Sequence, residues 1–445
     1  MTLYSKLALG ALALTLGACQ VTPPVTPAAM MCNFDPIPLE VEVPPENAGM
    51  GREGELADLM RASLASAPAR VDGELPSMLF MSGGGEHGAF GAGYLDGWAG
   101  TRPNGRLPQY RVVTGISTGS ILATFAFLGD TAKMVQGYSI TSERELLVPF
   151  IRVRDGHPTP GSLIRVMREG AVADLAPLRA RLLEEITPAV LAQVSEAHRG
   201  GRKLLVGAVD VDLGQAMVFD LTRMADRFVA AQTDAQRELL RGCYAEAILA
   251  SSSAPLAARP VFIDNRMYVD GGVRFGMFSD EIVAVTGRRG PATPVAPPLP
   301  RHQVYLIVNG NLEVSQECGK ADPSLCRPPD QPTGGSEGAH RPWNLVGLAG
   351  RSEKLLVNQV YRFSADRVRT QAEAAGNPFH FAKIEDDVDS HSYTLNDPVL
   401  GSGTRTCSQW TALDQQLDHP VQFFPRYMRC LIDYARKRGR SGEWR

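Results

Sequence analysis

A serine between two glycines is the first feature of the chain that suggests chemistry. The pentapeptide at residues 115–119 places Ser117 between Gly115 and Gly119, where one apolar run ends and another begins. This pattern predicts a strand, a tight turn and a helix, with the serine on the turn. The flanking glycines avoid collisions across such a turn, and the hydroxyl projects from the edge of the sheet. We therefore take Ser117 as a candidate nucleophile.

A second Gly-x-Ser-x-Gly motif surrounds Ser336, in a chain that has 44 glycines among 445 residues. By chance, such a motif arises on the order of a few tenths of a time in a chain of this composition. Ser336 follows the proline-rich residues 327–333, with no apolar run before it and no predicted helix directly after it. The context selects Ser117 and leaves Ser336 as a loop residue.

Three consecutive glycines, Gly83, Gly84 and Gly85, follow the apolar residues 78–81 and precede a predicted helix. Unobstructed backbone N–H groups at the N-terminus of a helix suit a developing oxyanion. With Gly88, these glycines also satisfy the pattern of a dinucleotide-binding loop. That alternative is disfavoured because it needs an acidic residue at the end of a second strand about 20 residues further on, and the chain has a Pro-Asn-Gly turn there.

Asp270 ends a predicted strand and is followed by Gly271 and Gly272. Open α/β sheets keep their active sites at the C-terminal ends of parallel strands, so Ser117 and Asp270 can converge there. A conventional triad also needs a histidine, but no histidine after Asp270 ends an apolar strand in a suitable way. The candidates are His302, His340, His380, His391 and His419, of which His380 and His391 come closest.

The elements that must position these residues alternate between strands and helices. Strands are predicted at residues 78–81, 112–113, 203–209, 216–219, 261–263, 267–269 and 304–308. Helices are predicted at residues 89–98, 119–128, 176–198, 236–249, 343–375 and 420–438. This alternation favours a mostly parallel sheet with helices on both faces. In the first helix, Gly93 and Gly97 lie four residues apart, which allows close packing.

The composition is that of an ordinary globular protein. Hydrophobic residues make up 44% of the chain, charged residues 21%, and the formal net charge is -3. Nothing in this balance suggests a nucleic-acid partner.

The N-terminus has the pattern of an export signal. Lys6 precedes an apolar run at residues 7–16, which is too short for a membrane-spanning helix of about 20 residues. Residues 16–19 resemble a bacterial lipobox, in which Cys19 becomes the lipid-modified first residue of the mature protein. Gln20 is not the aspartate that resembles an inner-membrane retention signal, so the resemblance favours an outer-membrane lipoprotein facing the periplasm. The alternative is a plain signal peptide with an incidental cysteine.

The other six cysteines suit an oxidising compartment. They are Cys32, Cys243, Cys318, Cys326, Cys407 and Cys430. Proximity in the sequence predicts the pairs Cys318–Cys326 and Cys407–Cys430, and the alternative is buried free thiols. No Cys-x-x-Cys pair occurs, which disfavours a zinc site.

Taken together, the glycine loop, the serine turn and the Asp-Gly-Gly motif resemble those of the patatin-like phospholipases in order, spacing and context. The resemblance covers roughly residues 75–309 and includes the Ser-Ser-Ser-Ala-Pro segment at residues 251–255. It implies a three-layer α/β/α sandwich and a serine-aspartate dyad, which fits the missing histidine. Ser117 is then the nucleophile and Asp270 the base, with an oxyanion hole at the glycine loop and no metal or cofactor. The supporting motif residues are His87, Gly88, Gly115, Gly119, Gly271 and Gly272.

One residue departs from the pattern of that family. His87 stands where the family usually carries arginine or lysine, so a fixed charge is replaced by one that depends on pH. We expect His87 to support the loop or a substrate phosphate only when its ring is protonated.

Four segments follow from these observations. They are a signal peptide (1–18), a proline-rich tether and extension (19–70), a hydrolase domain (71–400) and a C-terminal helical segment (401–445). The expected function is hydrolysis of carboxylic esters in membrane phospholipids or lysophospholipids, through an acyl-enzyme. The alternatives are a general carboxylesterase, thioesterase or acyltransferase, and a non-catalytic lipid-binding lipoprotein of the envelope.

Overall fold

The computed structural model describes most of the chain after the N-terminal segment. The described residues are 29–39, 55–68, 73–151, 153–154, 157–278, 300–313, 345–397, 399–442 and 444–445. Several residues singled out in the sequence lie outside these ranges. They are the predicted signal peptide, Cys19, most of the tether, Cys318, Cys326, Ser336 and His340.

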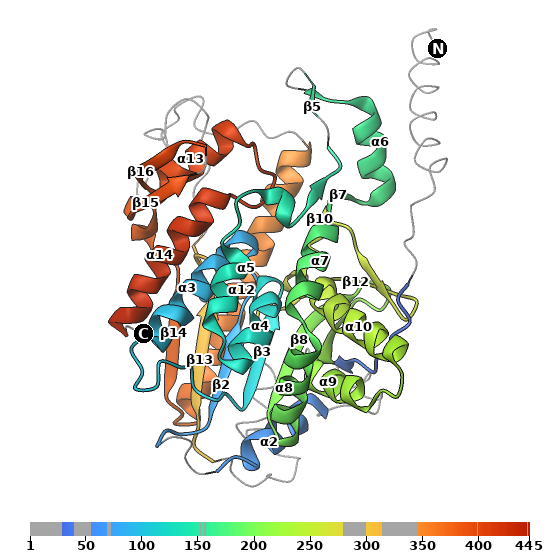
Figure 1. The fold of residues 1–445 in the computed structure, drawn as a ribbon, viewed down its shortest axis with the longest axis vertical. Coiled ribbons are helices and arrows are strands. Elements are labelled where there is room, and N and C mark those ends of the chain that lie inside the picture. Colours follow the sequence, from blue (N-terminus) through green and yellow to red (C-terminus); the bar gives the residue numbers. More distant parts are fainter. Residues whose placement is uncertain are drawn as a thin grey trace, which may run out of the picture.

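A nine-stranded sheet forms the centre of the described structure (Figure 1). Its main path runs β1 (Ile37–Pro38), β9 (Gln215–Asp220), β8 (Lys203–Asp210), β3 (Val112–Ile116), β2 (Ser77–Met81), β13 (Gln303–Val308) and β14 (Phe379–Lys383). β12 (Arg266–Asp270) pairs with β8 and with β11 (Val261–Ile263). The five strands from β8 to β14 are parallel, whereas β9, β1, β12 and β11 join by antiparallel pairing. The predicted mostly parallel α/β sheet is confirmed.

Three smaller sheets lie outside the central one. β10 (Leu256–Ala258), β7 (Ala171–Asp174) and β4 (Val148–Pro149) form the first of them. β15 (Ser392–Asp397) pairs with β16 (Gly401–Thr406), and β5 (Val153–Arg154) pairs with β6 (His157–Pro158).

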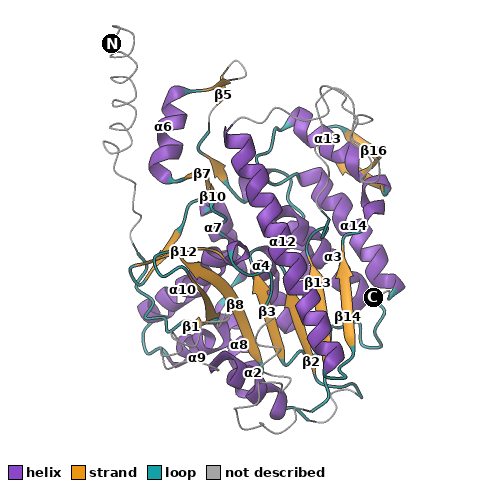
Figure 2. Ribbon diagram, turned by 180° about the vertical axis from the view of Figure 1, so that it is seen from behind, coloured by secondary structure: helices purple, strands orange, loops and turns teal. Residues whose placement is uncertain are grey.

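Helices cover both faces of the central sheet, because its parallel strands are apolar on both sides. In β2, Leu79 and Met81 belong to one hydrophobic core, and Met78 and Phe80 belong to the other. The first core is covered by α3 (Gly88–Ala99), α4 (Thr118–Leu128), α5 (Thr131–Tyr138), α7 (Ala176–Glu185), α8 (Pro188–Arg199), α9 (Leu221–Ala230), α10 (Asp234–Ser252), α13 (Cys407–Leu417) and α14 (Pro425–Ser441). The opposite face carries α2 (Glu55–Ala65) and α12 (Leu345–Ala374), and Figure 2 shows α12 lying in front of the strands. The result is a three-layer α/β/α sandwich.

The single helix predicted at residues 176–198 is two helices. α7 ends at Glu185 and α8 begins at Pro188. A proline is tolerated in the first turn of a helix but lacks the N–H that the interior of a helix needs. The side chain of Thr187 accepts a hydrogen bond from the N–H of Val190 and caps the second helix.

The predicted close approach at Gly93 and Gly97 is confirmed. A methyl group built on Gly93 would lie 2.4 Å from the carbonyl oxygen of Ile432, and one built on Gly97 would lie 2.1 Å from that of Arg436. Both carbonyls belong to α14, so the C-terminal helix packs directly on the backbone of α3. This contact connects the C-terminal region to the helix that follows the glycine loop.

Two disulfides are present in the described residues. The predicted Cys407–Cys430 pair is confirmed, and it joins α13 to α14. Cys32 pairs with Cys243 across 211 residues of sequence, which proximity along the chain did not indicate. Cys32 lies within the predicted tether and extension, so this second bond, together with the pairing of β1 with β9, fixes part of that segment to the domain.

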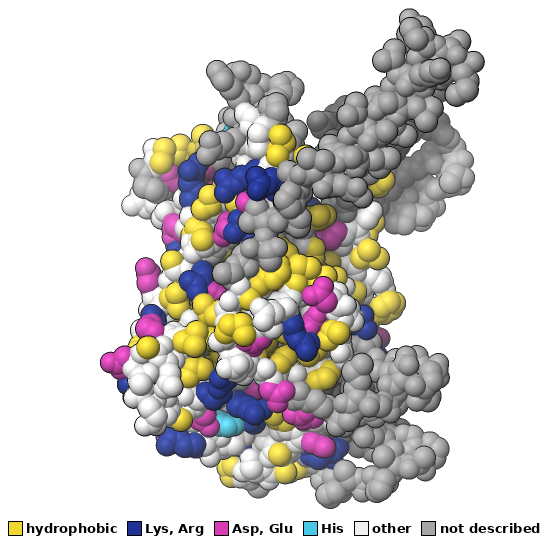
Figure 3. Space-filling view, turned by 90° about the vertical axis from the view of Figure 1, so that its right-hand side faces the viewer, with side chains coloured by type: hydrophobic (Ala, Val, Ile, Leu, Met, Phe, Trp, Pro, Cys, Tyr) yellow, Lys and Arg dark blue, Asp and Glu magenta, His cyan; other side chains and the backbone are white. Residues whose placement is uncertain are grey.

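Charged groups of both signs are interspersed with hydrophobic side chains on the face of the molecule shown in Figure 3. Among the described helices, none combines the length and the apolar composition that crossing a membrane requires.

Candidate active site

Ser117 lies on the turn between β3 and α4, as the sequence predicted. Its backbone has φ 53° and ψ -126°, a left-handed conformation that side chains other than glycine rarely adopt. A methyl group on Gly115 would lie 2.3 Å from the carbonyl oxygen of Gly119, and one on Gly119 would lie 2.4 Å from that of Met81. Both glycines are therefore required by the close approach of β3, α4 and β2.

Serines from the end of α10 hold this turn in place. The N–H of Ser117 donates to the hydroxyl of Ser251 over 3.0 Å, and that hydroxyl donates to the carbonyl of Gly207 on β8 over 2.6 Å. The carbonyl of Ser117 accepts from the hydroxyls of Ser252 and Ser120, at 3.1 and 2.6 Å. These bonds satisfy the backbone of the strained turn, so its amide is already occupied.

Asp270 lies near Ser117, as predicted, but the strand that carries it runs in a different direction from the one predicted. β12 is antiparallel to β8, whereas the sequence suggested that Asp270 ends a parallel strand. The edge of β8 is shared: β3 pairs with its first part up to Gly207, opposite Ile116, and β12 pairs with its end, where Ala208 lies opposite Asp270. The C-terminal ends of β3 and β12 therefore meet at the same edge of β8.

The carboxylate of Asp270 lies at this meeting point and is only 5% exposed. Burial raises its pKa to about 7, although hydrogen bonds from the side chain of Ser117 and the N–H of Gly272 act in the opposite direction. The carboxylate accepts the Gly272 N–H over 2.7 Å, and the N–H of Asp270 donates to the carbonyl of Ser253. A carboxylate with a raised pKa in contact with a serine hydroxyl can act as its base near neutral pH.

The glycine loop lies beside Ser117. Gly84 and Gly85 have φ values of 152° and 58°, and a methyl group on Gly84 would lie 1.7 Å from the carbonyl oxygen of Asn309. Asn309, at the end of β13, donates to Ser82 from its backbone and its side chain at 2.9 and 2.8 Å. It also accepts from the N–H of Gly91 in α3 at 3.1 Å. This amide therefore ties the loop to the strand before it and the helix after it.

The surroundings of His87 argue against the pH-dependent charge that the sequence predicted for it. Desolvation lowers its pKa to about 4, and the nearby Lys354 lowers it further. The ring is therefore neutral between pH 5 and 8, and it packs edge-on against Tyr427. At the adjacent Glu86, desolvation raises the pKa to about 8, so its carboxyl group is mostly protonated at neutral pH.

The histidines considered as triad members lie elsewhere. His391 binds the carboxylate of Asp433 at 2.9 Å, and His380 stacks on Tyr305. Among the described histidines, His87 is the one that lines the cavity at Ser117. No group of three or more His, Cys, Asp or Glu side chains in the described chain is arranged to hold a metal ion.

A cavity of about 490 Å³ opens over the candidate residues. Its floor contains Ser117, Asp270 and the glycine loop. One wall comes from α12 and includes Arg351, Glu353, Lys354, Val357, Asn358 and Tyr361. Another part of the lining comes from Val421, Gln422 and Phe424, immediately before α14. Much of the enclosure therefore comes from parts of the chain far from the motifs.

Residues 421–424 are held through their backbone by two carboxyl groups. Glu143 accepts the N–H groups of Val421, Gln422 and Phe423 at 2.9, 2.6 and 2.8 Å. Glu86 accepts the next N–H, that of Phe424, at 3.0 Å. This wall therefore depends on Glu86, which belongs to the turn after the glycine loop.

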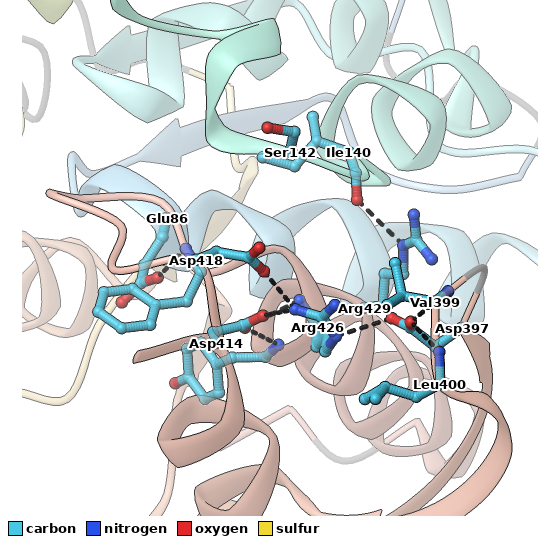
Figure 4. A network of polar contacts seen from close by, with 12 residues as sticks. Glu86, Ile140, Ser142, Asp397, Val399, Leu400, Asp414, Asp418, Arg426 and Arg429 are labelled. Carbon is cyan, nitrogen blue, oxygen red and sulfur yellow. Dashed lines mark hydrogen bonds and ion pairs between the residues drawn. The ribbon is translucent and has the colours of Figure 1, made fainter. Parts of the chain in front are cut away.

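A buried ionic cluster fixes the start of α14 (Figure 4). Arg426 donates to Asp397 at 2.7 Å, to Asp414 at 2.8 Å and also to Asp418. Asp414 in addition accepts the N–H groups of Arg426 and Tyr427 at the N-terminus of the helix, where its charge is favourable. The wall at residues 421–424 is thus bounded by a rigid helix start.

Sequence reasoning missed several residues of this site. Tyr361, Asn309 and Glu143 are isolated in the sequence, and no motif surrounds them. Only the Ser-Ser-Ser run at residues 251–253 carried a local signal, which had been noted as part of the family resemblance. The others became visible once the chain was folded.

A serine on a strand-turn-helix elbow, next to a buried carboxylate and a glycine loop in an α/β sandwich, is the arrangement of a serine hydrolase. Residues 79–278 match the family model described as "Patatin-like phospholipase". Its members are serine lipid hydrolases. No curated protein sequence matches the chain.

Two solved structures are similar to the chain at low identity. VipD from Legionella pneumophila is 13% identical with a TM-score of 0.28, and the match covers 56% of this chain and 50% of VipD. Human GIVD cytosolic phospholipase A2 is 11% identical with a TM-score of 0.29, and the match covers 87% of this chain and 64% of that protein. The chain thus spans about half of the first and less than two thirds of the second.

Proposed function

We propose that this protein hydrolyses carboxylic ester bonds of phospholipids or lysophospholipids, with Ser117 as nucleophile and Asp270 as base. The observation that carries the proposal is the placement of Ser117, on its strained turn, beside the buried Asp270 carboxylate and the glycine loop in one cavity. The family of residues 79–278 supports the lipid ester as the class of substrate.

The reaction follows from the charges at the site. Asp270 takes the proton of the Ser117 hydroxyl as its oxygen attacks the carbonyl carbon, and the raised pKa of Asp270 makes it a stronger base than a solvated carboxylate. The N–H groups of Gly83, Gly84 and Gly85 are the candidate donors to the oxyanion. Asp270 then returns the proton to the leaving alcohol, and water hydrolyses the acyl-enzyme by the same steps.

The cavity is also lined by charged groups that suit a charged headgroup. Arg351 and Lys354, one turn apart on α12, line it together with the acidic Glu313 and Glu353. Cations of this kind suit a phosphate, and the carboxylates suit an ammonium group. Phospholipids with a zwitterionic headgroup carry both a phosphate and an ammonium group.

We further propose that the enzyme works at the outer membrane, anchored through a lipid on Cys19 and facing the periplasm. The support is the short apolar run followed by Cys19. One acyl chain holds a protein only marginally, whereas two or more hold it stably. Replacing Cys19 by serine should move the protein from the membrane fraction to the soluble fraction of a bacterial host, and retention in the membrane would contradict the anchor.

The function is tested by offering the full chain, in a mild detergent, a phospholipid, a lysophospholipid, a triglyceride and a short-chain ester. We expect the two phospholipids to be hydrolysed fastest and Ser117→Ala to abolish the reaction, while Ser336→Ala leaves it unchanged. Preference for the short-chain ester would favour a general carboxylesterase. Hydrolysis that survives Ser117→Ala would contradict the dyad, and no hydrolysis of any ester would favour a lipid-binding lipoprotein.

A further inference from the structure

The hydroxyl group of Tyr361 lies at the centre of the site, although α12 is outside the family match at residues 79–278. A methyl group built on Gly83 would lie 2.1 Å from this hydroxyl oxygen and 2.9 Å from Cβ of Ser117. A methyl group built on Gly272 would lie 2.6 Å from the same oxygen and 3.1 Å from the carboxylate of Asp270. The hydroxyl therefore lies between the glycine loop and the turn after Asp270, next to Ser117.

No hydrogen bond to this hydroxyl is found in the part of the chain that the structure describes, and Tyr361 lines the cavity, to which its hydroxyl is accessible. The side chain is otherwise buried, with 9% of the residue exposed. A hydroxyl in such a place is free to hydrogen-bond with whatever occupies the cavity. A ligand in the cavity is in position to supply the missing acceptor.

Helix α12 holds Tyr361 in this position from both sides. Three residues before it, the side chain of Asn358 donates to the carbonyl of Asn311 at 3.2 Å. Three residues after it, the hydroxyl of Ser364 accepts the N–H of Gly276 at 3.1 Å. A methyl group on Gly276 would also collide with the ring and backbone of Tyr361, so the helix and the segment after Asp270 are in close contact. The hydroxyl is thus preorganised.

We propose that Tyr361 donates a hydrogen bond to the oxyanion formed at Ser117, in addition to the N–H groups of the glycine loop. As the serine oxygen bonds to the carbonyl carbon, the electron pair of the C=O bond moves to oxygen and the serine proton moves to Asp270. Tyr361 stabilises that oxygen and keeps its own proton throughout. The proposal rests on the proposed function of Ser117.

The charges around Tyr361 are consistent with a permanent donor. Burial holds its pKa well above the usual 10, and the negative charges of Asp270 and Glu353 raise it further. The hydroxyl therefore stays protonated near neutral pH, where the carboxylate of Asp270 becomes ionised.

Tyr361→Phe removes only this hydroxyl, and Tyr110→Phe is a matched control. Tyr110 is fully buried, its hydroxyl also has no partner in the described structure, and it lies in the core away from the cavity. The full chain in detergent is treated with a fluorophosphonate probe, whose phosphoryl oxygen takes the place of the oxyanion when Ser117 attacks phosphorus and fluoride leaves. Hydrolysis of a lysophospholipid is measured in parallel.

We expect Tyr361→Phe to slow probe labelling and kcat by about 10- to 100-fold, with KM within about twofold, because the hydrogen bond forms mainly in the transition state. Tyr110→Phe should leave both rates unchanged. Equal rates for the two variants, or a change in KM alone, would overturn the proposal, as would faster reaction of Tyr361→Ala, which would identify the ring as a plug.

Labelling by the fluorophosphonate probe tests the role of Tyr361 independently of the proposed phospholipid substrate. A parent that is labelled at Ser117 but does not hydrolyse phospholipids contradicts the proposed substrate, and a slower Tyr361→Phe still supports the oxyanion contact. A parent that the probe does not label at all overturns both the dyad and the role of Tyr361.

Discussion

Two regions of the molecule contribute to the cavity in different ways. Residues 79–278 supply Ser117, Asp270 and the glycine loop, all fixed by backbone contacts too close for any side chain at the glycines. Residues 345–442 supply α12 and the segment at residues 421–424, which enclose the cavity mainly with side chains. From this comparison we infer a division of labour, in which the first region carries out the reaction and the second selects the molecule that enters.

Tyr361 is an exception to this division between the two regions. It belongs to the enclosing region, yet it contacts the glycine loop and the turn after Asp270. If the division holds, substitutions in the first region lower kcat for every substrate, and substitutions in the second change discrimination between substrates.

The largest effect is expected for Asp270→Asn, which keeps the shape of the side chain and removes the base. We expect kcat to fall by about 10³- to 10⁴-fold for all esters. The matched control is Asp210→Asn, a buried carboxylate on β8 that is paired with Arg266. Activity of Asp270→Asn above about a tenth of the parent would contradict its role as base.

The same substitution should raise stability at high pH. The pKa of Asp270 is higher in the folded state than the ordinary value of 3.8, so the folded protein binds the proton more tightly than the unfolded chain. Its contribution to stability is complete below pH 4 and is lost as the pH rises to about 7. The Tm of Asp270→Asn relative to the parent should therefore increase between pH 4 and pH 8, as measured by thermal unfolding.

The pH dependence of the parent gives the next largest effect. Because Asp270 must be ionised to accept a proton, kcat/KM should rise about tenfold per pH unit up to about pH 7 and then level off. His87, with a pKa of about 4, does not titrate in this range. His87→Gln should keep the same midpoint, and a midpoint that moves with this substitution would restore the histidine as the titrating group.

A smaller and selective effect is expected at Lys354. Lys354→Gln should raise KM for a phospholipid about tenfold, since a hydrogen bond between charged groups contributes roughly 1.5 kcal/mol or more. A short uncharged ester should be hydrolysed as before. Arg362→Gln, an exposed cation on α12 outside the cavity, is the control. Equal losses on both substrates would show that the wall does more than recognise the headgroup.

The smallest effect is expected for Glu143→Gln, which weakens three backbone hydrogen bonds to residues 421–423. Hydrogen exchange at these amides should become faster, and kcat/KM should fall by about threefold. Glu238→Gln, an exposed acid on α10 paired with Arg241, should change neither quantity. If hydrogen exchange at residues 421–423 is unchanged in Glu143→Gln, Glu86 and the start of α14 hold this segment in place without Glu143.

The fold was largely predictable because its signals are local. Each strand of the parallel core is an apolar run, and each begins or ends near glycine or a polar turn, so the alternation with helices was visible. The break at Pro188 was missed because leucines on both sides continued the helical spacing. The Cys32–Cys243 disulfide was missed because its partners are 211 residues apart, and pairing over such a distance depends on the complete fold.

The sequence by itself determined the backbone geometry at Ser117, Gly115, Gly119 and the glycine loop, because the steric requirements of a tight turn depend on only a few neighbouring residues. Tertiary structure alone decided that Asp270 arrives on an antiparallel strand, sharing the edge of β8 with β3. It also decided that His87 is neutral and that Tyr361 faces the nucleophile. A pKa depends on all the groups that surround a side chain, and the position of a hydroxyl on a distant helix depends on packing, so no short motif could reveal either.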